Sequence, residues 1–137
     1  MHEYSRAVFY YETDQMGFVH HSNYLRWMEE ARTDYLNNIG MPYEAFEAHG
    51  VFSPVIGATL RYRRPARFGD RVTIRCRMAR YSGVRYTVSY TVHNQDDQLL
   101  AEAESEHAFI NAGHRPVSLA KAAPEIHTRL SALFPEA

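Results

Sequence analysis

The chain has 137 residues, of which 45% are hydrophobic and 23% are charged, a composition typical of a globular protein rather than of a disordered one. The net charge of −1 argues against general nucleic-acid binding, and no apolar run approaches the roughly 20 residues of a membrane span. A single cysteine, Cys76, excludes an internal disulfide. Since the first residues also lack the apolar core of a signal peptide, we expect a cytoplasmic protein.

The first predicted elements are a short strand and a long helix. Residues 4–11 are rich in aromatic side chains and predict the strand, and a loop through Asp14 and Gly17 follows it. Ser22 is a suitable N-cap for the helix, and Gly40 a suitable stop. Apolar residues recur at intervals of three and four in this helix, namely Tyr24, Met28, Ala31, Tyr35 and Ile39.

Four long strands are predicted after Val51, preceded by a short helical piece within residues 43–49. Alternation is clearest where Val72, Ile74, Cys76 and Met78 are interleaved with polar residues, mostly arginines. Turns are expected at Ser82-Gly83 and at residues 94–97, and the last strand should extend to Ile110. A C-terminal helix should follow Pro124, with an apolar stripe of Ile126, Leu130 and Leu133.

This order of elements predicts an α+β fold. Consecutive strands joined by short turns are expected to pair antiparallel. Curling that sheet around the one long amphipathic helix is the economical way to bury the helix's apolar stripe. No repeat or linker interrupts the chain, so we expect a single domain over residues 1–137.

A specific motif spans the loop and the helix. Seven residues stand in the pattern D-x-x-G-x-V-x-x-x-x-Y-x-x-x-x-E-x-A-R, namely Asp14, Gly17, Val19, Tyr24, Glu29, Ala31 and Arg32. The pattern resembles the 4-hydroxybenzoyl-CoA thioesterase branch of the hotdog superfamily. The resemblance implies a sheet wrapped around a central helix and hydrolysis of an acyl-CoA thioester to a free acid and CoA. It also implies a homo-oligomer, either a dimer or a tetramer of two dimers, with active sites at the interface.

The resemblance assigns roles to particular residues. Asp14 corresponds to the carboxylate that attacks the thioester or activates water, and the backbone N–H of His21 to the donor that polarises the carbonyl. The pairing is physically sound, because the start of a helix offers free N–H groups and a partial positive charge to an oxyanion. This scheme requires neither a metal nor an organic cofactor. Further substrate contacts are expected from Gly17, Val19, Tyr24, Ser53, Pro54 and Val55.

The arginines are clustered: nine of the fourteen lie between Arg61 and Arg85. Guanidinium groups suit the phosphates of CoA, so Arg63, Arg64, Arg80 and Arg85 are candidate CoA contacts. For each arginine taken singly, a solvated strand face is an equally good interpretation.

Several alternatives stay open at this level. The chain could be a non-catalytic module that binds acyl-CoA or acyl-carrier protein, or a hotdog dehydratase. His20 and His21 have no further ligand at a supporting spacing, so we expect no metal site, and Cys76 falls on the apolar side of its strand as a buried thiol. Glu29 and Arg32 could pair along the helix. Acyl-chain specificity is not readable: Phe18, Trp27, Tyr35 and Phe52 could line a tunnel, an aromatic slot or the core.

Overall fold

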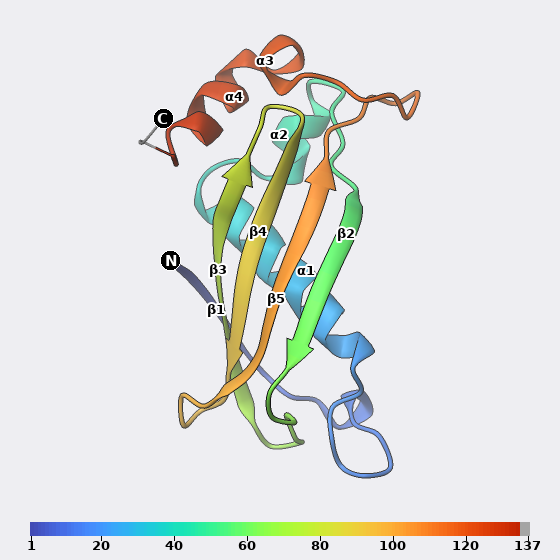
Figure 1. Ribbon diagram of the computed structural model, residues 1–137, viewed down its shortest axis with the longest axis vertical. Coiled ribbons are helices and arrows are strands. Elements are labelled where there is room, and N and C mark those ends of the chain that lie inside the picture. Colours follow the sequence, from blue (N-terminus) through green and yellow to red (C-terminus); the bar gives the residue numbers. More distant parts are fainter. Residues whose placement is uncertain (135–137) are drawn as a thin grey trace.

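The computed structural model describes residues 1–134, which form a five-stranded sheet with helices packed against it (Figure 1). The strands are β1 (His2–Ala7), β2 (Val55–Tyr62), β3 (Arg71–Tyr81), β4 (Arg85–His93) and β5 (Leu99–Ala108). The helices are α1 (Ser22–Asn38), α2 (Tyr43–Glu47), α3 (Leu119–Ala122) and α4 (Pro124–Ser131), with a 3-10 helix at Tyr10–Glu12. Within residues 1–134 no helix combines the length and the apolar character needed to cross a membrane.

The sheet is entirely antiparallel, with the order β1-β3-β4-β5-β2, and α1 lies against one of its faces (Figure 1). The predicted α+β class and the hotdog arrangement of a sheet around one long helix are therefore confirmed. The predicted pairing of consecutive strands holds for β3 with β4 and for β4 with β5. It does not hold for β2, which pairs with β5 and forms one edge of the sheet.

The central helix α1 starts differently from the prediction. His21 already has helical backbone angles (φ −57°, ψ −29°), so Ser22 is the first residue of α1 and not its N-cap. Ring atom Nδ1 of His20 accepts the N–H of Ser22 at 3.2 Å. An imidazole therefore caps the start of the helix, where a serine hydroxyl was expected. The helix stops as predicted, because Gly40 has φ +76°, a conformation that favours glycine.

The core lies between α1 and the sheet. Tyr24, Met28 and Ala31 are buried as the apolar periodicity predicts, and Trp27 is fully buried beside them. The last two positions of the predicted stripe, Tyr35 and Ile39, are only half-buried and pack at the margin of the core, while Leu36 is buried in their place. Six further buried residues come from the three central strands, namely Val72, Ile74, Cys76, Val88, Val92 and Leu100.

The first strand is shorter than predicted and begins earlier. β1 covers His2–Ala7, and Tyr10–Glu12 turns into a 3-10 helix instead of continuing the strand. The carboxylate of Glu12 accepts a hydrogen bond from the backbone N–H of Phe9 at 2.8 Å, which closes this turn. At the other end of the chain Ile126 and Leu130 are buried as predicted, but Leu133 lies beyond α4 and is 39% exposed.

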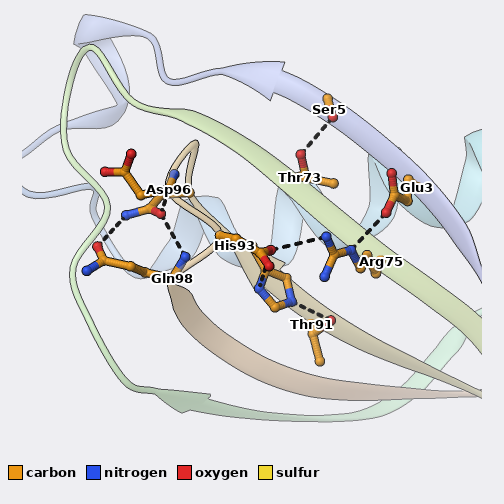
Figure 2. Close-up of polar contacts among 10 residues, drawn as sticks. Glu3, Ser5, Thr73, Arg75, Thr91, His93, Asp96 and Gln98 are labelled. Carbon is orange, nitrogen blue, oxygen red and sulfur yellow. Dashed lines mark hydrogen bonds and ion pairs between the residues drawn. The ribbon is translucent and has the colours of Figure 1, made fainter.

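The arginine-rich outer face predicted for β3 is present. Arg75 lies between β1 and the β4–β5 turn, with Nε 2.8 Å from a carboxylate oxygen of Glu3 and one terminal nitrogen 3.1 Å from Asp97 (Figure 2). Asp97 also lies 3.5 Å from the ring of His93. These exposed ion pairs tie β1 to the turn at the end of β4, on the face of the sheet that α1 does not cover.

Candidate active site

A cavity of about 400 Å³ lies at the N-terminal end of α1. Its walls come from the loop before α1, the first turns of α1, the end of β2 and the segment that follows β2. The lining residues are Asp14, Phe18, Val19, His20, His21, Tyr24, Tyr62, Arg63, Arg64 and Pro65. Six residues assigned to the site from the sequence thus share one cavity, namely Asp14, Val19, His21, Tyr24, Arg63 and Arg64.

Asp14 is held by its own loop through one carboxylate oxygen. Oδ1 accepts hydrogen bonds from the backbone N–H groups of Met16 at 2.8 Å and Phe18 at 3.2 Å. Gly17 permits this tight turn with φ +82°, which explains the glycine in the motif, although Gly17 itself does not line the cavity. The other oxygen, Oδ2, accepts no hydrogen bond from any residue between 1 and 134. Among residues 1–134, closing the turn therefore uses one carboxylate oxygen of Asp14 and leaves the other without a partner.

The start of α1 leaves one backbone donor free. The N–H of Ser22 bonds the ring of His20, that of Asn23 bonds the carbonyl of His20, and that of Tyr24 bonds the carbonyl of His21. The N–H of His21 has no acceptor within the described part of the chain. An N–H at this place lies at the positive end of the helix and suits a developing oxyanion.

Tyr24 builds the wall opposite the loop. Its hydroxyl oxygen accepts the backbone N–H of Ala66 at 3.2 Å, and burial raises its pKa, so the phenol keeps its proton. The ring of Tyr62 meets Tyr24 edge-on with centroids 5.1 Å apart. Val19 is buried, and its N–H bonds the carbonyl of Ala66 at 2.8 Å. Tyr24 and Val19 therefore shape the cavity by fixing the segment that carries Arg63 and Arg64.

A buried ion pair that the sequence did not reveal anchors the loop that carries Asp14. Glu12 is 4% exposed; its carboxylate lies 2.9 Å from the guanidinium of Arg6 and accepts the indole N–H of Trp27 at 3.0 Å. The carbonyl of Glu12 accepts the side-chain N–H of Asn23 at 2.9 Å. These bonds join β1, the loop and α1 two residues before Asp14. The sequence does not reveal this role, because the two side chains that bond the carboxylate, Arg6 and Trp27, are six and fifteen positions away, and the one near partner is the backbone N–H of Phe9.

Three predicted substrate contacts lie elsewhere in the chain. Ser53, Pro54 and Val55 line a second cavity of about 240 Å³, next to the middle of α1 and to α2. Glu29 and Arg32 border the same cavity and are paired through two hydrogen bonds of 2.9 and 2.8 Å, as the sequence suggested. Within one chain, Ser53 and Asp14 do not share a cavity.

The four candidate CoA contacts divide into two pairs. Arg63 and Arg64 border the Asp14 cavity, where Arg63 is also bonded to Glu102 at 2.7 Å. Arg80 and Arg85 border another cavity, near the turn between β3 and β4, and Arg80 is bonded to Glu104 at 3.0 Å. A single chain therefore presents only the first pair to a ligand held by Asp14.

Most of the remaining candidates fall outside the Asp14 cavity. Burial raises the pKa of the Cys76 thiol to about 12, so this side chain is an unreactive part of the core, as predicted. His107, on β5, is fully buried. Across residues 1–134 no three His, Cys, Asp or Glu side chains gather closely enough to hold a metal ion. Among the aromatic candidates, Phe18 lines the Asp14 cavity, Phe52 lines the Ser53 cavity, and Trp27 belongs to the core.

Comparison with known proteins gives the family. The sequence profile of the thioesterase-like superfamily matches residues 8–136. YneP of Bacillus subtilis, named as a candidate acyl-CoA thioesterase, is 35% identical over 122 residues and 88% of each chain. The acyl-CoA thioester hydrolase YbgC of Escherichia coli is 32% identical over 97 residues, 71% of this chain and 72% of its own. The solved DHNA-CoA thioesterase of Staphylococcus aureus superposes with a TM-score of 0.92 at 28% identity, over 97% of this chain and 90% of that one. The chain therefore belongs to the thioesterase-like superfamily, and it has the hotdog fold and the thioester-hydrolase class of activity found there.

Proposed function

We propose that the chain hydrolyses an acyl-CoA thioester to a free carboxylic acid and CoA, with Asp14 and the His21 N–H as its catalytic groups. One observation carries the proposal: Asp14 has a carboxylate oxygen and His21 a backbone N–H without a hydrogen-bond partner among residues 1–134, and both residues line the same cavity. Relatives named as acyl-CoA thioesterases support the choice of substrate. No metal or cofactor enters the scheme.

The chemistry follows from what each group can do. The His21 N–H stabilises the negative charge that develops on the thioester oxygen. Asp14 either takes a proton from the attacking water or attacks the carbonyl itself, forming an anhydride that water then opens. In both routes water adds to the acyl carbon, the carbon–sulfur bond breaks, and the CoA thiolate leaves and takes up a proton. Asp14 itself acts as the base or as the nucleophile, so neither route requires a second side chain as partner base.

Arg63 and Arg64 are the proposed contacts for the phosphates of CoA. Both are exposed at the mouth of the cavity, and Arg64 has no ion-pair partner among residues 1–134. A guanidinium that is free of carboxylates can bind a phosphate without first losing an ion pair. Arg80 and Arg85 lie at the far end of the sheet and would reach the same CoA only from a second copy.

A homo-oligomer paired along β2 is part of the proposal. This edge strand leaves Val55, Ile56 and Tyr62 45–49% exposed, and an unpaired apolar edge favours strand pairing. Two-fold pairing of β2 with itself is antiparallel and brings the Val55 end of one copy to the Tyr62 end of the other. Tyr62 borders the Asp14 cavity and Val55 the Ser53 cavity, so such a dimer would join the two cavities. A tetramer would be two such dimers.

The proposal also covers the domain organisation, the cellular compartment and a second type of acyl donor. We take residues 1–137 as a single catalytic domain that acts in the cytoplasm, a compartment consistent with the single thiol Cys76. An acyl-carrier protein presents the same thioester as CoA, and is therefore an alternative donor to include among the substrates.

The direct test is thiol release from a panel of short, long and aromatic acyl-CoA thioesters and one acylated carrier protein, followed with a thiol-reactive dye. We expect turnover of at least one CoA thioester, and no stimulation by added divalent metal. Binding of the panel without thiol release would identify a binding module and contradict the proposal.

A further inference from the structure

A series of hydrogen bonds, buried in its middle part at Arg32 and Tyr86, leads from α1 to Ser53. Glu29 holds the guanidinium of Arg32 through two hydrogen bonds, and a third nitrogen of Arg32 donates to the hydroxyl oxygen of Tyr86 at 2.5 Å. The Tyr86 hydroxyl lies 3.2 Å from Oγ of Ser53. Arg32 is 3% exposed and Tyr86 2%, so both side chains are fixed inside the protein. Apart from the Glu29–Arg32 pair, none of these contacts is between residues close in sequence.

The direction of these bonds is determined by the chemistry of the groups. Arg32 can only donate, so the Tyr86 oxygen must accept from it. The single hydroxyl hydrogen of Tyr86 has one acceptor in the described part of the chain, Oγ of Ser53. Because Ser53 therefore accepts, its own hydrogen is left to be donated elsewhere, and no residue between 1 and 134 accepts it.

The charge states of both buried groups keep this direction. Burial is the largest single influence and would lower the pKa of Arg32, but the hydrogen bonds to Glu29 and the Coulombic effects of Tyr86, Tyr43 and Glu29 together outweigh it and raise the pKa, so the guanidinium stays charged. Burial also raises the pKa of Tyr86, so the phenol keeps the hydrogen that it donates. The positive charge of Arg32 strengthens the hydrogen bonds that follow it in this series, and so makes the Ser53 hydroxyl a better donor.

The free hydrogen of Ser53 belongs to the cavity that Ser53 shares with Val55. Every acyl thioester has a carbonyl oxygen at its acyl end, and this oxygen can accept a hydrogen bond. We propose that Arg32 and Tyr86 are positioning residues, and that they hold Ser53 as a hydrogen-bond donor to the carbonyl oxygen of the acyl thioester. The inference rests on the proposed function and on the joining of the two cavities across β2; it adds a second donor opposite the His21 N–H.

Ligand binding tests this donor without requiring turnover. The probes are the ketone analogues of benzoyl-CoA and hexanoyl-CoA, in which a methylene replaces the sulfur, and the thioethers S-benzyl-CoA and S-hexyl-CoA, which lack the carbonyl. Ser53→Ala and Tyr86→Phe should each weaken ketone binding, measured by calorimetry, by roughly five- to tenfold. Neither should change thioether binding by more than about twofold. The double variant should bind the ketones like Ser53→Ala alone, since Tyr86 acts through Ser53.

Tyr90→Phe is the matched control. Tyr90 lies on the same strand, is equally buried, and its hydroxyl also bonds a serine, Ser105, at 2.7 Å. Tyr90→Phe should lower the melting temperature as Tyr86→Phe does but leave ketone affinity unchanged.

Three results would overturn the inference: unchanged ketone affinity in Ser53→Ala, equal losses for ketone and thioether, or losses that multiply in the double variant. Absence of wild-type binding to both ketones would also overturn it. Normal ketone binding without thiol release from any acyl-CoA would instead overturn only the proposed hydrolysis.

Discussion

The two carboxylate oxygens of Asp14 have different surroundings. Oδ1 closes the turn to Met16 and Phe18, and Oδ2 is left for chemistry. The turn fixes the carboxylate before substrate arrives, so little ordering remains to be done in the reaction. The start of α1 is arranged in a similar way. The ring of His20 accepts the N–H of Ser22, while the N–H of His21 between them has no acceptor among residues 1–134. The two groups proposed as catalytic are therefore left available by the way in which the loop and the helix begin.

Arg64 should matter for binding CoA more than for chemistry. Its side chain is exposed at the cavity and has no carboxylate partner among residues 1–134. Arg64→Ala should raise KM for acyl-CoA by roughly three- to tenfold with kcat nearly unchanged, and high salt should reduce the difference. The matched control is Arg77→Ala, an exposed arginine of β3. Equal KM values in the two variants would rule out the contact.

His107 should make stability depend on pH. Burial, with the nearby charge of Arg32, lowers the pKa of His107 from 6.5 to about 3, although the Ser53 backbone opposes the shift. The unfolded chain therefore takes up a proton that the folded chain does not. The stability contributed is complete above pH 6.5 and is lost as the pH falls below it, by up to about 1.4 kcal/mol per pH unit.

Urea unfolding of the wild type and of His107→Gln between pH 7.5 and 4.5 measures this effect. The wild type should lose stability more steeply with falling pH than the variant. The same slope in both proteins would show that His107 does not titrate in this way.

At the scale of elements, the periodicity of apolar residues and the positions of glycines made much of the fold predictable. Alternation along residues 71–81 and the glycine at position 40 gave β3 and the end of α1, because both signals are local. The pairing of β2 with β5 was not predictable, because it joins segments some 40 residues apart and depends on where the whole sheet can close. The motif likewise pointed to Asp14 and His21, which the structure places together. The buried anchors Glu12 and Tyr86 carried no signal, because only folding gives them partners.

The junction of β1, the loop and α1 should depend strongly on Glu12. Glu12→Gln removes the buried counter-charge of Arg6 and leaves it only the partly exposed carboxylate of Glu30, 3.4 Å away, so we expect a loss of about 3 kcal/mol in the free energy of unfolding measured in urea. Glu3→Gln is the control, because the bond of Glu3 to Arg75 (Figure 2) lies at the surface, so little stability should be lost. Equal destabilisation by the two changes would contradict a structural role for the buried pair.

For the whole molecule, the proposed site is shared between two copies. Light scattering should give a mass at least twice the 15.9 kDa of one chain, and Ile56→Asp on the exposed edge of β2 should lower it. Mixing Asp14→Asn with Ser53→Ala gives hybrid dimers in which one of the two sites has both native groups. Such mixtures should recover roughly a quarter of wild-type activity, well above the sum of the separate variants. No recovery after subunit exchange would place the whole site within one chain.

The central claim is that the Asp14 carboxylate performs the hydrolysis, and the turnover number of Asp14→Asn tests it most directly. Asparagine keeps the side-chain oxygen that closes the loop but loses the charge, so the fold and KM should change little. Asp70→Asn is the control, because Asp70 also accepts a backbone N–H in a loop, that of Arg67 at 2.9 Å. On an acyl-CoA that the wild type hydrolyses, we predict that Asp14→Asn lowers kcat by about a thousandfold or more while Asp70→Asn stays within a few-fold of wild type. A folded Asp14→Asn variant with kcat within tenfold of wild type would contradict the account.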